Sequence, residues 1–131
     1  MIITLLKKYC FTILVLLIIF ILCLMNTAPL PIPPIRNIDK YMHEIMYVGL
    51  AGVVFFDNTG YLRFSISKMR IFLGSFLFPI VIGGLIEIMQ TYLTTTRTGD
   101  WLDLLFDTAG AFLGWGISLL INQYLLVKRK S

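Results

Sequence analysis

Long apolar runs dominate this sequence and limit the folds that it can adopt. Read with their flanks, four segments suit a helix that crosses a bilayer, which needs about 20 largely apolar residues, with a range of about 17–25. We expect helices at about residues 9–25, 41–56, 71–90 and 104–127. The second of these segments is the shortest and the most polar, so its ends are the least sharply defined.

The composition agrees with this interpretation. Of the 131 residues, 58% are hydrophobic and 14% are charged, whereas soluble domains are about 45–50% apolar and about 25% charged. The length suits a single domain with a few membrane-crossing helices. The sequence therefore predicts an all-α fold, namely a four-helix transmembrane bundle formed by one domain over residues 1–131.

The first apolar run also has some features of a signal peptide, because Lys7 and Lys8 precede it. However, the run is long for the apolar part of a signal peptide. The stretch MNTAPLP that follows it offers no clear small-x-small cleavage site. We therefore expect this segment to be retained as a helix.

Lys and Arg residues are distributed unequally between the two ends of the expected helices. Eight lie before the first helix, between the second and third, or after the fourth, and three lie in the other two loops. Those three are Arg36, Lys40 and Arg97. Because positively charged loops tend to remain in the cytoplasm, both termini should be cytoplasmic, and the loops NTAPLPIPPIRNIDK and TYLTTTRTGD should face outward.

Polar side chains of the last three expected helices gather near this outward end. Glu87 and Asp107 each lie about one turn inside a helix, and ionisable groups at such depth usually face a bundle interior or a wet cavity and mark a functional site. Ordinary interfacial residues at helix ends are the alternative, which explains any single residue but explains the group less well. The candidate ligand-binding residues are Asp39, Lys40, His43, Glu87, Gln90, Arg97, Asp100, Asp103 and Asp107.

Helical spacing places several of these residues on shared faces. Asp39, His43 and Tyr47 are four residues apart, so they form one stripe on the second helix. A second stripe, on the fourth helix, consists of Asp103, Asp107, Gly110 and Gly114. Because glycines let a neighbouring backbone come close, we expect a shallow polar pocket that opens outward and is lined by the last three helices.

The chemistry of these residues leaves several roles open. His43 titrates near physiological pH and suits a general base or a metal ligand, or it forms a hydrogen bond between helices. Glu87 suits an acid or base, or belongs to a structural ion pair. Arg97 suits bidentate binding of phosphate or carboxylate. Carboxylates outnumber the nearby cations, so some are protonated or paired, or a cation joins the site.

Recognised motifs for metals, cofactors and nucleic acids are missing from the sequence. With one histidine in the chain and no paired-cysteine motif, zinc is not expected, and nothing supports a carboxylate-bound Mg²⁺ or Ca²⁺. There is no glycine-rich phosphate loop and no nucleophile elbow. The basic loop YLRFSISKMR and the tail KRK should contact anionic headgroups rather than nucleic acid. We therefore predict no metal and no cofactor.

The residues of the outward end also carry a resemblance to a known family. The motifs are DKYMHEIMY (39–47), EIMQ (87–90), RTGDWLD (97–103) and DTAGAFLG (107–114). In their order and spacing they resemble the VanZ-like family of small bacterial integral membrane proteins, over about residues 36–117. One position departs from the family pattern, which usually has Asn where this chain has Asp107. The departure leaves open whether the site needs an amide or a carboxyl at this position.

The resemblance implies a multi-pass protein of the bacterial cytoplasmic membrane. The family is named after a protein associated with resistance to teicoplanin, a lipidated glycopeptide antibiotic that acts at the outer membrane face. One function open to the chain is non-catalytic: a cell-envelope protein that binds the headgroup of a membrane lipid or lipid-linked wall precursor. The other is a small intramembrane enzyme acting on a lipid headgroup, with Glu87 or His43 as acid or base. We favour the first because no catalytic unit is recognisable; a homo-oligomer also remains open.

Overall fold

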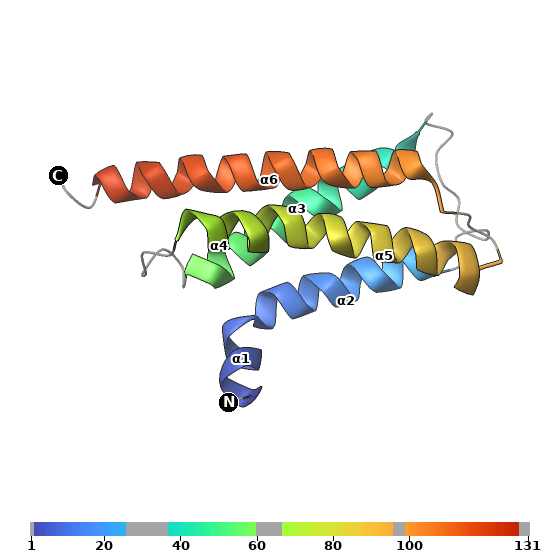
Figure 1. Ribbon diagram of the computed structural model, residues 1–131, viewed down its shortest axis with the longest axis horizontal. Coiled ribbons are helices and arrows are strands. Elements are labelled where there is room, and N and C mark those ends of the chain that lie inside the picture. The colour runs from blue at the N-terminus through green and yellow to red at the C-terminus, as the bar shows by residue number, and fades with distance from the viewer. Residues whose placement is uncertain (1, 26–36, 60–66, 96–98, 129–131) are drawn as a thin grey trace.

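The computed structural model describes residues 2–25, 37–59, 67–95 and 99–128 (Figure 1). In these ranges all regular structure is helical, which confirms the all-α prediction for this part of the chain. The elements are α1 (Ile2–Lys8), α2 (Cys10–Leu24), α3 (Ile38–Thr59), α4 (Lys68–Phe72), the π-helical turn η1 (Leu73–Leu77), α5 (Phe78–Leu93) and α6 (Trp101–Lys128). The helix expected at 41–56 thus extends further in both directions as α3.

Helix α3 occupies the centre of the arrangement. It packs against α2, η1 and α6, while α5 packs against α2 and α6. α3 and α6 begin at the same end of the molecule, where α2 and α5 terminate, and α1 turns away from α2 at the other end (Figure 1). The buried apolar core consists of Ile19, Cys23, Tyr47, Leu50, Val54 and Ile86.

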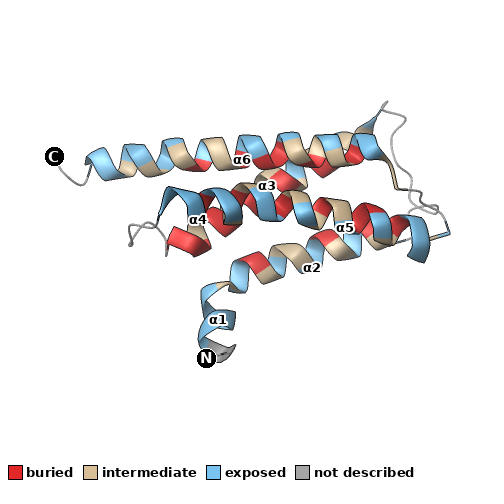
Figure 2. Cartoon of the chain, in the orientation of Figure 1, coloured by how far each residue is buried: buried red, intermediate tan, exposed pale blue. Residues whose placement is uncertain are grey.

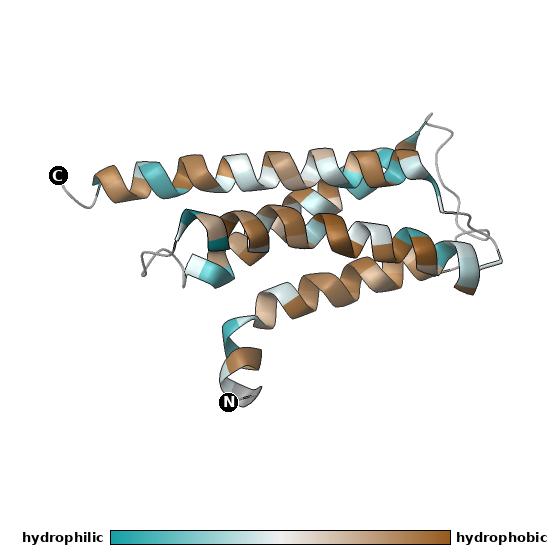
Figure 3. Ribbon diagram, viewed as in Figure 1, coloured by the Kyte–Doolittle hydropathy of each residue, from teal (hydrophilic) through white to brown (hydrophobic). Residues whose placement is uncertain are grey.

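Large apolar side chains cover much of the outside of the helices. Leu17, Ile45 and Leu120 are more than half exposed. Apolar residues occur along all of the long helices (Figure 3). The buried positions (Figure 2) include several polar residues, such as Asp57 and Ser75. A helix that is apolar all round is either buried in a large core or spans a membrane. By length and composition, the segments Lys68–Leu93 and Trp101–Lys128 are able to cross a membrane. Both observations agree with a membrane protein.

Local sequence explains where α3 and α6 begin. Asn37 precedes α3 with a φ of 61°, a left-handed conformation that asparagine adopts more readily than most residues. Asp100 caps α6, because its Oδ1 accepts the N–H of Leu102 at 2.9 Å in the manner of an N-cap residue. Both helices therefore start with a charged first turn at the same end of the molecule.

Pro79 lies in the second position of α5. Its ring has no N–H to donate and clashes with the carbonyl four residues earlier in a regular helix. The turn η1 immediately precedes it, and such π-helical turns interrupt the regular ladder without ending the helix. α4, η1 and α5 therefore form one continuous rod of 26 residues.

α3 and α6 approach each other most closely at two glycines. A Cβ atom on Gly110 would collide with the backbone carbonyl of Glu44, and one on Gly114 with that of Val48. Small residues at such positions let two backbones come together, as is usual between membrane helices. This contact brings the first turns of the two helices side by side.

Substituting alanine for Gly114 should push α3 away from α6 and lower the melting temperature of the detergent-purified protein, because overpacking costs about 1–3 kcal/mol. Gly116→Ala is the matched control on the same helix, since an added Cβ there meets no atom within 4 Å. The control should be neutral or slightly stabilising, as alanine is favoured over glycine in helices by about 1 kcal/mol. Equal melting temperatures for the two variants would contradict close packing at Gly114.

Candidate functional site

A group of titratable side chains lies where α3 and α6 begin and α5 ends. We call it the acidic site, and its members are Lys40 and His43 of α3, Glu87 of α5, Asp100 just before α6, and Asp103 and Asp107 of α6. The exposed fraction is 8% for Glu87, 6% for Asp103 and 0% for Asp107. Burial of charged groups costs free energy unless they are paired and hydrogen-bonded, so their partners determine what the site can do.

Lys40 connects the first turn of α3 to the start of α6. Its Nζ donates to Asp100 Oδ2 at 2.7 Å and to Asp103 Oδ1 at 2.9 Å. The hydrogen bond from Lys40, assisted by the N–H of Leu102, holds the pKa of the Asp100 carboxyl below its usual value. Asp100 is therefore ionised at neutral pH, and Lys40 neutralises part of the charge of two carboxylates.

His43 pairs with Asp107 in the interior. His43 Nδ1 lies 3.0 Å from Asp107 Oδ1, and both side chains are buried. The other oxygen, Oδ2, is buried without a hydrogen-bond partner among the described residues. It faces Gly83 of α5, where an added Cβ would lie 2.6 Å from it. Glycine at position 83 thus makes room for the Asp107 carboxyl.

Glu87 is held by the loop that precedes α6. Its Oε2 accepts the backbone N–H of Asp100 at 2.7 Å. Gly99 packs against the same helix, because a Cβ on it would collide with the carbonyl of Glu87. Among the described residues, Glu87 Oε1 is buried with no hydrogen-bond partner, and no Lys, Arg or His forms an ion pair with Glu87. Glu87 is therefore the member of the acidic site whose charge is least compensated.

The structure does not join all of the predicted residues to this group. Gln90 is buried, and its Nε2 donates to the carbonyl of Cys23 at 2.9 Å, which ties α5 to α2. Asp39 is exposed in the first turn of α3, and it has no ion pair or side-chain hydrogen bond within the described ranges. Arg97 lies outside the described residues.

A groove of about 580 Å³ runs between α5 and α6 beside the acidic site. Glu87 and Asp100 line it together with the apolar side chains of Leu85, Ile88 and Leu104. Trp101 also lines the groove and is 85% exposed. The sequence predicted a polar pocket lined by the last three helices, whereas the residues that line this groove come from α5, α6 and the two residues before α6. The pattern of one helix does not show how a neighbouring helix lies against it.

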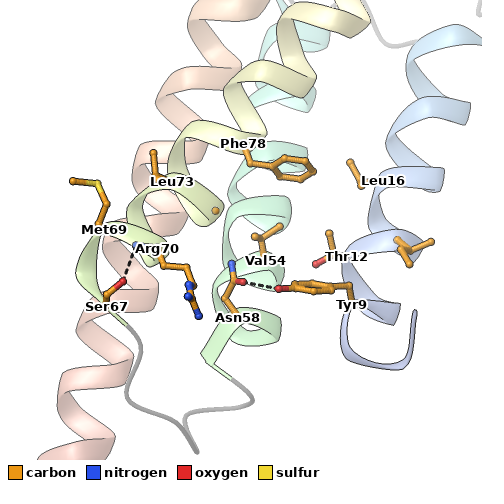
Figure 4. Close-up of a pocket in the computed structure, with 12 residues that line it drawn as sticks. Tyr9, Thr12, Leu16, Val54, Asn58, Ser67, Met69, Arg70, Leu73 and Phe78 are labelled. Atoms are coloured by element: carbon orange, nitrogen blue, oxygen red, sulfur yellow. Dashed lines mark hydrogen bonds between the residues drawn. The ribbon is translucent and has the colours of Figure 1, made fainter. Parts of the chain in front are cut away.

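Sequence analysis missed a second polar cluster, at the opposite end of α3 (Figure 4). Tyr9 donates its hydroxyl to Asn58 Oδ1 at 3.0 Å, beside a cavity of about 730 Å³. The backbone N–H and hydroxyl of Thr12 donate to Asp57 Oδ2 at 3.0 and 2.8 Å. Asp57 and Asn58 directly follow the helix expected at 41–56, whereas α3 continues to Thr59 and buries them. These contacts fix α2 against α3.

The position that departs from the family pattern gives a direct test of the His43 contact. Asp107→Asn keeps an oxygen that accepts a hydrogen bond from His43 Nδ1, whereas Asp107→Leu has similar bulk and no acceptor. The Leu variant should lose about 1–3 kcal/mol of stability, because a buried donor is left without a partner, and the Asn variant should stay close to the wild type. Melting temperatures in one detergent measure this difference. If the two variants melt equally early, the negative charge of Asp107 is required.

Comparison with known proteins agrees with the motifs of the acidic site. The family model described as VanZ/LLP1 matches residues 8–122, which include every member of the site. No curated protein and no solved structure matches the chain. Membership of this family is consistent with a membrane protein linked to glycopeptide resistance. As its outward-end motifs predicted, the chain belongs to the VanZ/LLP1 family.

Proposed function

We propose that this protein crosses the bacterial cytoplasmic membrane four times, with both termini in the cytoplasm, and binds an amphiphile at its outward end. The amphiphile is a membrane lipid or a lipid-linked wall precursor. One observation carries the proposal: the groove between α5 and α6 is lined both by apolar side chains and by Glu87 and Asp100 of the acidic site. A ligand that contacts both kinds of side chain needs a polar head and a hydrocarbon chain.

The side chains around the groove support this arrangement. Glu87 Oε1 is buried without a hydrogen-bond partner among the described residues, so a headgroup with a hydroxyl or an amine can supply one. Tyr92 and Trp101 line the groove and are strongly exposed, as aromatic residues often are at the boundary between lipid and water. The headgroup would lie at that boundary and the chain would follow α5 and α6 into the membrane.

The charges of the acidic site restrict the headgroup. Carboxylates outnumber the one lysine of the site, so a bare anionic headgroup is poorly matched. A sugar or amine headgroup donates hydrogen bonds to carboxylates, and a phosphate becomes compatible when a cation accompanies it. Lipid-linked wall precursors carry both sugars and phosphate. Binding such a molecule at the outer face would change the access of lipidated glycopeptides to it, which gives the family's link to resistance a physical basis.

An enzymatic role is the second candidate, and the contact between His43 and Asp107 favours it. A histidine oriented by a carboxylate beside an unpartnered Glu87 oxygen is an arrangement suited to acid–base chemistry. Glu87→Gln distinguishes the two functions. An enzyme should lose turnover and keep its bound lipid, whereas a binding protein should lose function in proportion to affinity.

Filling the groove should remove the lipid. Gly84 lines the groove, and a Cβ atom added there meets no atom within 4 Å, so Gly84→Leu should place its side chain in the groove without forcing the backbones apart. Gly49→Leu is the matched control, because position 49 is also open but lies on α3 outside the groove. Mass spectrometry of lipids that co-purify with each variant measures the effect. Equal amounts of the same lipids on both variants would refute binding in the groove.

Cysteine labelling tests the orientation. In a background without Cys10 and Cys23, a cysteine at Thr95 should react with a membrane-impermeant thiol reagent in intact cells, and one at Ser131 should not. This expectation follows from the eight-to-three distribution of Lys and Arg. The reverse labelling pattern would place the acidic site at the cytoplasmic face.

A further inference from the structure

Three side chains of the acidic site converge from three different helices. His43 of α3, Glu87 of α5 and Asp103 of α6 each offer one potential ligand atom, and these atoms lie within 4.8 Å of one another. All three residues are buried. They differ from an ordinary surface cluster of acids, because they include an imidazole and because one of them has an unpartnered oxygen.

Each of the three side chains is oriented by a contact that leaves another atom available. Glu87 uses Oε2 to accept the N–H of Asp100. The residue is only 8% exposed, and its Oε1 is buried without a partner among the described residues. Asp103 uses Oδ1 to accept from Lys40, which leaves Oδ2. When His43 Nδ1 donates to Asp107, Nε2 keeps its lone pair. Metal-binding histidines commonly have such a carboxylate partner on their other nitrogen.

The charges of the site also favour a bound cation. Lys40 forms an ion pair with Asp103, and Asp107 shares a hydrogen bond with His43, but Glu87 has no cationic partner within the described ranges. A buried carboxylate without a partner is costly. A divalent cation placed among the three side chains would compensate Glu87 and the remaining charge of Asp103 together.

We propose that His43, Glu87 and Asp103 form a binding site for one divalent transition-metal ion, with Zn²⁺ as its preferred occupant. Zn²⁺ ligands lie about 2.0–2.2 Å from the metal, so a tetrahedral ion holds them about 3.3–3.6 Å apart. Starting from 4.8 Å or less, the ligand atoms need to approach by roughly one ångström. Such a shift requires rotation of the Glu87 and Asp103 side chains.

The ligand set selects among metals. Imidazole favours transition metals, whereas Mg²⁺ and Ca²⁺ prefer sites made of oxygen atoms alone. Three protein ligands also leave a coordination position open, and a phosphate oxygen or a water molecule fits there. The absence of a metal motif in the sequence does not conflict with this site, because its ligands come from three helices and therefore have no fixed spacing along the chain.

Titration with Zn²⁺ alone tests the proposal. The full chain, purified with a tag that lacks histidine and stripped with EDTA, should bind one Zn²⁺ per chain in isothermal titration calorimetry. Glu87→Gln and Asp103→Asn should each weaken binding at least 10-fold, since each removes a charged ligand. Mg²⁺ and Ca²⁺ should compete at least 100-fold less well. Glu44→Gln is the matched control on α3, one residue from His43 and outside the group, and its affinity should stay within twofold of wild type.

A second measurement needs no variant. Co²⁺ added to the metal-free wild-type protein should develop visible absorption bands that differ from those of aqueous Co²⁺, because protein ligands replace water. The proposal is overturned if the wild type shows no saturable Zn²⁺ binding, if Glu44→Gln weakens it as much as Glu87→Gln does, or if Co²⁺ keeps its aqueous spectrum. Because the probe is the metal alone, failure here leaves the lipid proposal standing. Conversely, loss of lipid from the Gly84→Leu variant does not bear on the metal.

Discussion

The close contact between α3 and α6 determines which charges meet in this protein. The two helices run in the same direction, and Glu44 lies against Gly110 as Val48 lies against Gly114, one helical turn further along. With the helices in this register, the turn before Gly110 sets His43 beside Asp107, and the turn before that sets Lys40 beside Asp103. A buried ion pair that loses one partner costs about 3–5 kcal/mol. Because Gly110 and Gly114 have no side chains, the two helices come close enough for these buried charged groups to find their partners.

The negative charges of the three buried carboxylates of the site are compensated in different ways. This difference distinguishes the carboxylates that hold helices together from the one that we propose binds a ligand. Asp103 has a lysine and Asp107 has a histidine, so each belongs to a contact that holds α3 to α6. Glu87 has one backbone N–H and a buried oxygen without a partner. It also lines the groove. The lipid proposal also rests on the groove and the metal proposal on the convergence of three side chains, and both place the ligand at this oxygen.

Sequence alone predicted the all-α fold, the family and most of the acidic site, because depth in an apolar segment and helical spacing are properties of one helix. It did not predict partners that lie on different helices. Gln90 has the depth of a site residue, but its amide binds the carbonyl of Cys23 on α2, and no pattern within either segment indicates that contact. Asp57 is as polar as a loop residue, but Thr12 of α2 satisfies it inside the fold. Such pairings depend on how helices rotate against each other, which periodicity does not determine.

The π-helical turn affects how the chain tolerates changes in length. Ile71, Ser75, Pro79, Gly83 and Glu87 are all buried at steps of four residues. A regular helix turns about 100° per residue. Glu87 lies sixteen residues after Ile71, so in a regular helix it would be rotated about 160° around the axis from Ile71. The looser winding at Leu73–Leu77 absorbs much of that rotation and keeps both residues on the inner face. A family member that lacked one residue of this turn would simply wind it as an ordinary helix and keep Glu87 inside. One that lacked a residue between Phe78 and Glu87 would rotate the carboxylate by about 100°, toward the lipid.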